Sequence, residues 1–74
     1  MDMIKYYALL DKVNEEITKR SLTYRDLGSI MGIDHTTLYR VLAGKRKRPN
    51  PVLVSKVIKC LERDDLLFEL LSLM

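Results

Sequence analysis

The sequence predicts an all-α domain built from five helices, and three observations support this prediction. Apolar residues recur every three or four positions in separate segments, which is the spacing of one helix face. Glycines and helix-capping residues divide these segments. No segment has the pattern of a strand. With 74 residues and no linker or internal repeat, the chain is predicted to form a single domain over residues 1–74.

The first two helices are expected over residues 3–20 and 24–31. Thr23 precedes the second helix and Asp26 follows three residues later, which is the pattern of a capping box. The second helix is too short to be stable alone, so it must pack on a partner. The side chains expected to face the core are Met3, Tyr6 or Tyr7, Leu10, Val13 and Ile17 in the first helix and Leu27, Ile30 and Met31 in the second.

A third helix is expected over residues 35–43, between two glycines. Gly32 can take the left-handed conformation that ends a helix, and Asp34 can cap the helix that follows. Gly44 ends the third helix. The residues of this region expected in the core are Ile33, Leu38, Val41 and Leu42.

The last two helices are expected over residues 51–62 and 65–73. Asn50 can cap the first of them, and Pro51 suits its first position because a missing N–H costs nothing there. The apolar residues are Leu53, Val54, Val57, Ile58 and Leu61 in the first of these helices, and Leu66, Leu67, Phe68, Leu70, Leu71, Leu73 and Met74 in and after the second.

Composition indicates a small cytoplasmic protein. The one cysteine, Cys60, cannot form an intrachain disulfide, and core packing is its expected role. No apolar run approaches the roughly 18 residues of a membrane span, and the N-terminal MDMIKYY lacks the apolar core of a signal peptide. His35 has no second histidine with which to share a metal. We therefore expect a cytoplasmic protein with no membrane, metal, cofactor or small-molecule partner.

Positive charge is concentrated in one part of the chain, although the net charge is only +3. Residues 1–44 carry six cations and six acids, residues 45–63 carry seven cations against Glu62, and residues 64–74 carry three acids and no cation. A run of adjacent cations is either a solvated loop or a nucleic-acid contact, and its neighbours must decide between the two. The run consists of Lys45, Arg46, Lys47 and Arg48.

Two short helices joined by Gly32-Ile33-Asp34 match the dimensions of a helix-turn-helix unit. The second of these helices opens with small hydrogen-bonding side chains and carries Arg40 in its middle. Arginine can donate two hydrogen bonds to guanine, and threonine can bond to a base edge or touch a thymine methyl group. An ordinary solvent face would more often carry glutamate and lysine. These features favour DNA as the partner.

The segment LTYRDLGSIMGIDHTTLYRVLAGK, residues 22–45, resembles the helix-turn-helix of the Cro and lambda-repressor type, the Xre family. Position 28 departs from the family pattern with glycine in place of the usual alanine, and Leu42 stands where many members have glutamate. The resemblance implies a five-helix lambda-repressor-like fold over the whole chain. The residues that carry it are Leu27-Gly28, the turn Gly32-Ile33, Asp34 at the start of the recognition helix and Gly44 at its end.

The resemblance also implies roles for individual residues. One set would lie in the major groove and contact bases: His35, Thr36, Thr37 and Arg40. A second set would contact phosphates, because cations and helix N-termini favour phosphate oxygens irrespective of base. This second set is Tyr24, Tyr39, Lys45, Arg46, Lys47, Arg48 and Asn50.

The apolar tail, residues 64–74, is predicted to form a dimerisation helix. Its apolar side chains exceed what one small core can absorb, and an exposed apolar patch on a small chain marks a contact surface. Complete burial within the same chain is the alternative. The predicted interface consists of Leu66, Leu67, Phe68, Leu70, Leu71, Leu73 and Met74.

We therefore expect a sequence-specific double-stranded DNA-binding transcriptional regulator, a Cro-like or phage- or plasmid-type repressor that acts as a homodimer on a palindromic operator. One alternative is an antitoxin or accessory regulator whose C-terminal tail binds another protein. Another is a helical protein-interaction module that does not bind DNA. An enzyme is not expected, because the sequence contains no set of nucleophile and base, no paired-carboxylate cleft and no metal-ligand cluster.

Overall fold

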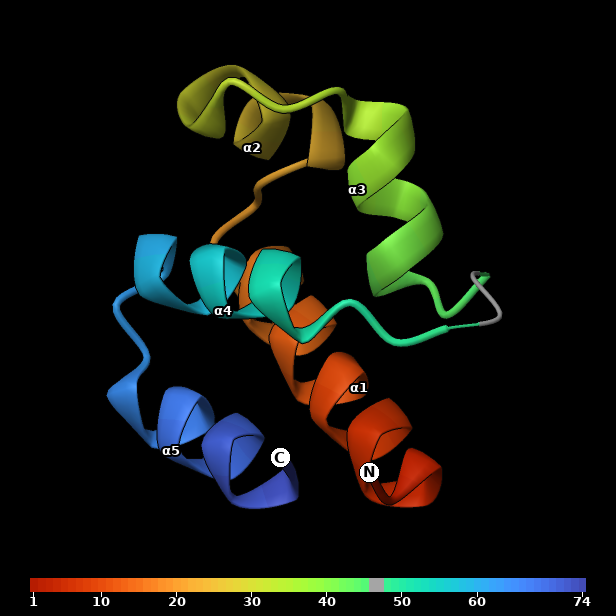
Figure 1. Cartoon of the computed structure of the whole chain (residues 1–74). Helices are drawn as coiled ribbons and strands as arrows, with labels where there is room; N and C mark the ends of the chain where they lie inside the picture. Colours follow the sequence, from red (N-terminus) through yellow and green to blue (C-terminus); the bar gives the residue numbers. More distant parts are fainter. Residues whose placement is uncertain (46–47) are drawn as a thin grey trace.

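Five α-helices in the order α1 to α5 make up the computed structural model, which describes residues 1–45 and 48–74. Figure 1 places α2 and α3 at one end of the molecule and both chain termini at the other. The described residues contain no strand, so the all-α prediction is confirmed, with helix ends within two residues of those expected. The bounds are α1 Met3–Lys19, α2 Tyr24–Met31, α3 His35–Leu42, α4 Pro51–Cys60 and α5 Asp64–Leu73.

The core lies where α1, α3, α4 and α5 meet, and α2 packs chiefly on α3 (Figure 1). In α1 the inward tyrosine is Tyr6, which is 3% exposed, while Tyr7 is 42% exposed. Leu9 is completely buried, although it is not among the residues that the helical spacing predicts to face the core. None of the helices in the described residues is long and apolar enough to cross a membrane. The buried apolar residues are Tyr6, Leu9, Leu10, Val13, Ile17, Leu27, Leu38, Val41, Leu42, Leu53, Val54, Val57, Ile58, Leu61, Leu66 and Leu70.

The backbone of α2 comes unusually close to the turn before α3 at Gly28. A Cβ atom at this position would lie 2.4 Å from the carbonyl oxygen of Ile33 and 3.3 Å from the backbone nitrogen of His35. Such distances are shorter than van der Waals contact, so only glycine fits without moving the backbone. The buried face of α2 is thus Leu27 and Gly28. Ile30 lies off this face and is 64% exposed, so the prediction that it points inward is wrong.

Helix ends agree with the predicted caps. Thr23 and Asp26 form a capping box, Asp34 accepts a hydrogen bond from the amide of Thr36, and Asn50 accepts one from the amide of Leu53. Gly32 and Gly44 adopt φ of 68° and 70°, which confirms that they end α2 and α3 in the left-handed region. The same conformation occurs without glycine after α1 and α4, at Ser21 and Glu62.

A group of ionic side chains ties the end of α1 to the link between α4 and α5. Glu16 is buried, and its carboxylate accepts hydrogen bonds from Arg20 Nε at 2.7 Å and from Arg63 Nη1. Arg20 also donates to the carbonyl of Leu61, and Arg63 forms a two-point pair with Asp65. Because this group spans both left-handed turns that lack glycine, it helps to hold them in place.

The charge on Glu16 is expected to stabilise the fold. Hydrogen bonds from Arg20 and then Arg63 hold the pKa of Glu16 below its ordinary value of 4.5, and Arg63 lowers the pKa of Asp65 from 3.8 to about 2. Carboxyls with lowered pKa stabilise the folded state above their ordinary pKa, and this stabilisation is lost as the pH falls through their folded values. Glu16→Gln should therefore lower the melting temperature by several degrees at pH 7, and the difference from the unmodified protein should shrink as the pH falls below 4.5.

Melting curves followed by circular dichroism from neutral pH down to about pH 2 check this expectation, because carboxyls titrate in the lower part of this span. Glu15→Gln is the matched control, because Glu15 is the exposed neighbour on the same helix. A Glu16→Gln difference that is the same at every pH would show that Glu16 acts through packing and not through its charge.

Candidate functional site

The exposed side of α3 brings together most of the residues predicted to contact bases. His35, Thr36 and Arg40 are exposed and Thr37 is half-buried. Thr36 and Arg40 are separated by four positions, as are His35 and Tyr39, so each pair lies on the same side of the helix. The carboxylate of Asp34 lies 3.7 Å from His35 Nδ1 at the start of this surface. We call the exposed set His35, Thr36, Tyr39 and Arg40 the α3 face.

Buried residues hold the α3 face outward. Leu38, Val41 and Leu42 are almost completely buried on the opposite side of the same helix. Leu42 is only 1% exposed, so leucine at this position fills the core and does not alter the exposed surface. Many members of the family that the sequence resembles have glutamate at this position. The departure from that pattern therefore lies in the core and not on the α3 face.

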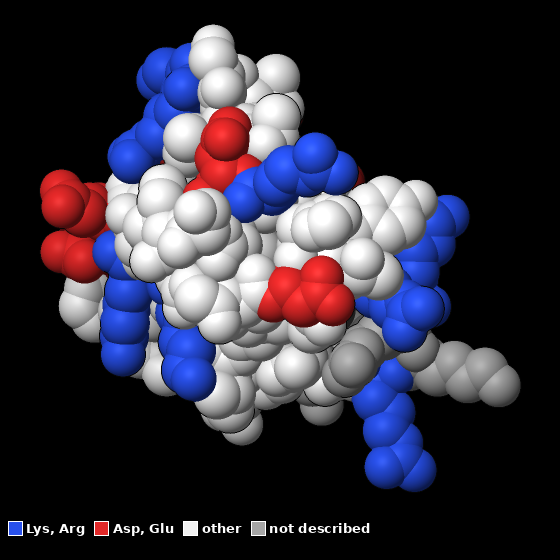
Figure 2. All heavy atoms as spheres, turned by 90° about the horizontal axis from the view of Figure 1, so that it is seen from above, with Lys and Arg blue, Asp and Glu red and all other residues white. Residues whose placement is uncertain are grey.

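Cations follow α3 directly. Lys45 and Arg48 are exposed, whereas Arg46 and Lys47, which were predicted to contact phosphates, lie outside the described residues. Seen from the end that carries α2 and α3, some lysine and arginine side chains lie at the right-hand edge, on the side of α3 and the chain that follows it, and others lie at the left and the top (Figure 2). The described cations thus continue the surface begun by the α3 face.

The chain after α3 leads into α4, which packs against α3, and Asn50 ties the start of α4 to α1 (Figure 1). The Asn50 side-chain oxygen accepts from the amide of Leu53 at 3.1 Å, and its backbone amide donates to the hydroxyl of Tyr6 at 3.2 Å. Burial raises the pKa of Tyr6, so this phenol stays protonated at neutral pH. Asn50 is half-buried, and the contacts of its oxygen and its backbone amide are internal, so its direct role is to position the N-terminus of α4.

Tyr24 and Tyr39, both predicted to contact phosphates, differ in their surroundings. Tyr39 is 46% exposed and lies on the α3 face. Tyr24 is half-buried, and its hydroxyl donates to the side-chain oxygen of Asn14. The two rings meet edge-on, with centroids 6.0 Å apart and planes at 64°. The only side-chain donor of Tyr24 is thus engaged inside the protein, so we no longer assign Tyr24 to the phosphate contacts.

The structure divides the predicted dimer interface on α5. Leu66 and Leu70 are 2% and 0% exposed and belong to the core, so their prediction as interface residues is wrong. The reason is that α5 packs against both α1 and α4, which cover this side of it. Leu67 and Leu73 are half-buried against the core. The outer surface retains Phe68, Leu71 and Met74, which are 72%, 54% and 72% exposed.

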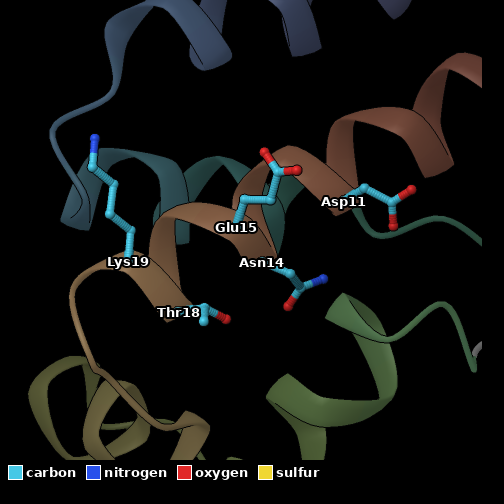
Figure 3. A pocket seen from close by; sticks show the side chains of 5 residues that line it. All are labelled: Asp11, Asn14, Glu15, Thr18 and Lys19. Carbon is cyan, nitrogen blue, oxygen red and sulfur yellow. The ribbon is translucent and has the colours of Figure 1, made fainter.

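An open groove of about 670 Å³ runs along α1 (Figure 3). It carries charges of both signs and contains none of the predicted site residues. Among the described residues, no group of three or more His, Cys, Asp or Glu could hold a metal ion. The groove is lined by Asp11, Asn14, Glu15, Thr18 and Lys19.

Asn14 and Glu16 are among the polar residues whose structural roles the sequence pattern did not predict. No local pattern identifies Asn14, because a single amide on the flank of an amphipathic helix looks like any solvated side chain. Glu16 follows Glu15 in a charged part of the sequence, yet it is 7% exposed. A signal was present for Glu16, since Arg20 follows it at four positions, the spacing of an ion pair on a helix.

No family model, no curated protein and no solved structure matches this chain. The function proposed below therefore rests on this chain's own residues: the α3 face, the cations that follow it and the outer surface of α5.

Proposed function

We propose that the chain is a sequence-specific double-stranded DNA-binding protein that regulates transcription, with α2 and α3 as its helix-turn-helix and α3 as the recognition helix. The observation that carries this proposal is the α3 face, an exposed polar helix surface that is followed at once by cations. The resemblance of residues 22–45 to the Cro and lambda-repressor type points the same way. The proposed action is repression by occupying a promoter.

Base contacts are assigned to three members of the α3 face, His35, Thr36 and Arg40, and to the neighbouring Thr37. Tyr39, the remaining member of the face, stays assigned to the phosphates. A helix fits into the major groove of B-DNA, where each base pair presents a distinct pattern of donors and acceptors. Arg40 can donate two hydrogen bonds to a guanine, and Thr36 can donate to or accept from either kind of base edge. His35 lies at the start of α3, the end that a recognition helix presents most deeply to the groove.

Phosphate contacts are assigned to Lys45, Arg48 and the first turn of α4. Lysine and arginine attract phosphate oxygens whatever the base sequence, and a helix N-terminus carries a partial positive charge. In the first turn of α4 this charge is the attraction, because Pro51 has no N–H and the amide of Leu53 donates to Asn50. These groups flank the α3 face, so they could hold the backbone while α3 reads the bases. Arg46 and Lys47 are included by their place in the sequence alone.

A homodimer is the proposed binding form. One recognition helix reads only a few base pairs, and a two-fold dimer places two such helices in successive major grooves about 34 Å apart. The outer surface of α5, namely Phe68, Leu71 and Met74, supports this proposal because large exposed apolar groups mark contact surfaces. The same surface favours a second candidate function, an antitoxin or accessory regulator whose α5 binds a different protein.

Selection of bound sequences from a random pool of duplex DNA tests the proposal. The expected result is enrichment of one motif in two inverted copies, separated by about one helical turn. Failure to enrich any sequence at low salt would overturn sequence-specific binding, and enrichment of a single unrepeated half-site would overturn the dimer.

Arg40→Ala is expected to weaken binding to the preferred site by about 1 to 3 kcal/mol and to affect random DNA much less. The reason is that a two-point contact with guanine exists only where the correct base is present. Dissociation constants from fluorescence anisotropy on both DNAs measure the difference. Lys5→Ala is the control, because it removes an exposed positive charge near the N-terminus, away from α2 and α3. Equal losses on both DNAs would reassign Arg40 to the phosphate backbone.

Replacing Lys45 and Arg48 together by alanine should weaken binding to all duplex sequences alike. A protein with fewer phosphate contacts releases fewer counterions when it binds DNA. The slope of log affinity against log salt should therefore become shallower by about one for each contact that is lost. Titrations at several salt concentrations measure this slope. The control changes Lys5 and Lys59, which removes the same charge from exposed positions elsewhere. An unchanged slope would make Lys45 and Arg48 part of a solvated loop.

A further inference from the structure

Asn14 links α1 to both α2 and α3. Its side-chain nitrogen donates to the carbonyl of Leu10 in its own helix at 2.9 Å and to the carbonyl of Leu42 at 2.8 Å. Its side-chain oxygen accepts the hydroxyl proton of Tyr24. Figure 3 shows the Asn14 side chain pointing from α1 toward the end of α3. One amide therefore connects residues from three helices.

The contact with Leu42 falls at the last residue of α3. The next three backbone amides donate to carbonyls earlier in α3. Ala43 donates to the carbonyl of Tyr39, Gly44 to that of Val41 and Lys45 to that of Arg40. None of these amides is used for the carbonyl of Leu42, which accepts from Asn14 instead. Because helix-end carbonyls need donors from outside the helix, Asn14 supplies one of them from a different helix.

The contact with Tyr24 falls at the first residue of α2. Burial, and to a smaller extent the neighbouring Tyr39, raises the pKa of Tyr24, so its hydroxyl keeps the proton that it donates. The Tyr24 ring also meets Tyr39, one turn before the end of α3. Asn14, the Tyr24 hydroxyl and the Leu42 carbonyl form a unit that we call the Asn14 clamp. It holds the start of α2 and the end of α3 against α1.

We propose that Asn14 is a positioning residue for sequence readout, an inference that rests on the proposed DNA-binding function. The Leu42 carbonyl lies between Arg40, on the α3 face, and Lys45, the first phosphate-contacting cation. Fixing this point sets where the base-reading side chains stand relative to the cations and to the first turn of α4. A misplacement of about 1 Å is enough to weaken contacts that depend on direction, and phosphate attraction tolerates such a shift better.

The test compares Tyr24→Phe and Asn14→Leu with the unmodified protein. Tyr24→Phe removes only the hydroxyl and keeps the ring against Tyr39. Glu16→Gln is the control, because it weakens the fold at a place that does not touch α2 or α3. Affinities for the preferred site and for random DNA are measured at a temperature where all variants are folded. Tyr24→Phe should lower the ratio of the two affinities about fivefold, the size of one net hydrogen bond, and Asn14→Leu should lower it further.

A purely structural role would give a different result. Loss of stability alone reduces the folded fraction equally for both DNAs, so the ratio would stay constant, as expected for Glu16→Gln. An unchanged ratio in Tyr24→Phe and Asn14→Leu would overturn the positioning role. A protein that shows no preference among DNA sequences before any change would instead overturn the proposed function.

A second measurement examines the clamp without DNA. Residual dipolar couplings report the direction of α3 relative to α1 in solution. Asn14→Leu should change this direction and Glu16→Gln should not. An unchanged direction in Asn14→Leu would overturn the clamp whatever the DNA measurements give.

Discussion

Leu70→Asp is expected to unfold the domain, whereas Phe68→Asp, two positions away on the same helix, should leave it folded. Leu70 is completely buried, so the substitution removes its packing and places an unpaired charge among apolar side chains. The combined cost should be about 4 kcal/mol or more, which is comparable to the whole stability of a domain of this size. Phe68 is 72% exposed, so its replacement should change stability by about 0.5 kcal/mol at most.

Circular dichroism and urea titration of both variants measure these effects. Phe68→Asp also tests the dimer, because its side chain belongs to the outer surface of α5. Sedimentation should give the mass of two chains for the unmodified protein and of one chain for Phe68→Asp, with weak binding to half-sites. A stable, fully helical Leu70→Asp would contradict the docking of α5 on the core. A dimeric Phe68→Asp would locate the dimer interface elsewhere.

Gly28→Val is expected to cost about 3 kcal/mol or more. The first added carbon would lie 2.4 Å from the carbonyl oxygen of Ile33, and this oxygen belongs to the backbone, which cannot move aside as a flexible side chain would. The turn that joins α2 to α3 would have to open. In DNA-binding assays, the same variant should lose its preference for one sequence, because the α3 face would be displaced from the cations.

Ser29→Val is the matched control, since Ser29 is the exposed next residue of the same helix. Both substitutions introduce the same branched side chain into α2, so the difference between them isolates the close contact. Urea unfolding at equilibrium gives the two free energies. Equal stabilities for Gly28→Val and Ser29→Val would show that the turn yields at little cost.

Much of this fold could be predicted from local signals. The capping box at Thr23, the left-handed glycines Gly32 and Gly44, and the Asn50-Pro51 start of α4 each act within a few residues, so the sequence displays them directly. The exposed α3 face could be identified for the same reason, because one helical turn places its members together. The left-handed turns after α1 and α4 could not be predicted this way, because Ser21 and Glu62 adopt φ of 56° and 57° without the glycine that marks such turns.

The features of the candidate site likewise fall into two groups, those set by near neighbours in the sequence and those set by contacts between distant residues. The sequence by itself determined the five helices, the caps at Thr23, Asp34 and Asn50, and the identity of the polar and cationic residues, because periodicity and capping depend on near neighbours. Only the tertiary structure decided that Leu66 and Leu70 are core residues while Leu71 and Met74 are exposed. All four lie on one wide apolar stripe of the tail, and the buried part of this stripe is chosen by α1 and α4. Asn14 gained its role in the same way. Its partners, Tyr24 and Leu42, lie 10 and 28 residues away, and no local pattern brings these groups together.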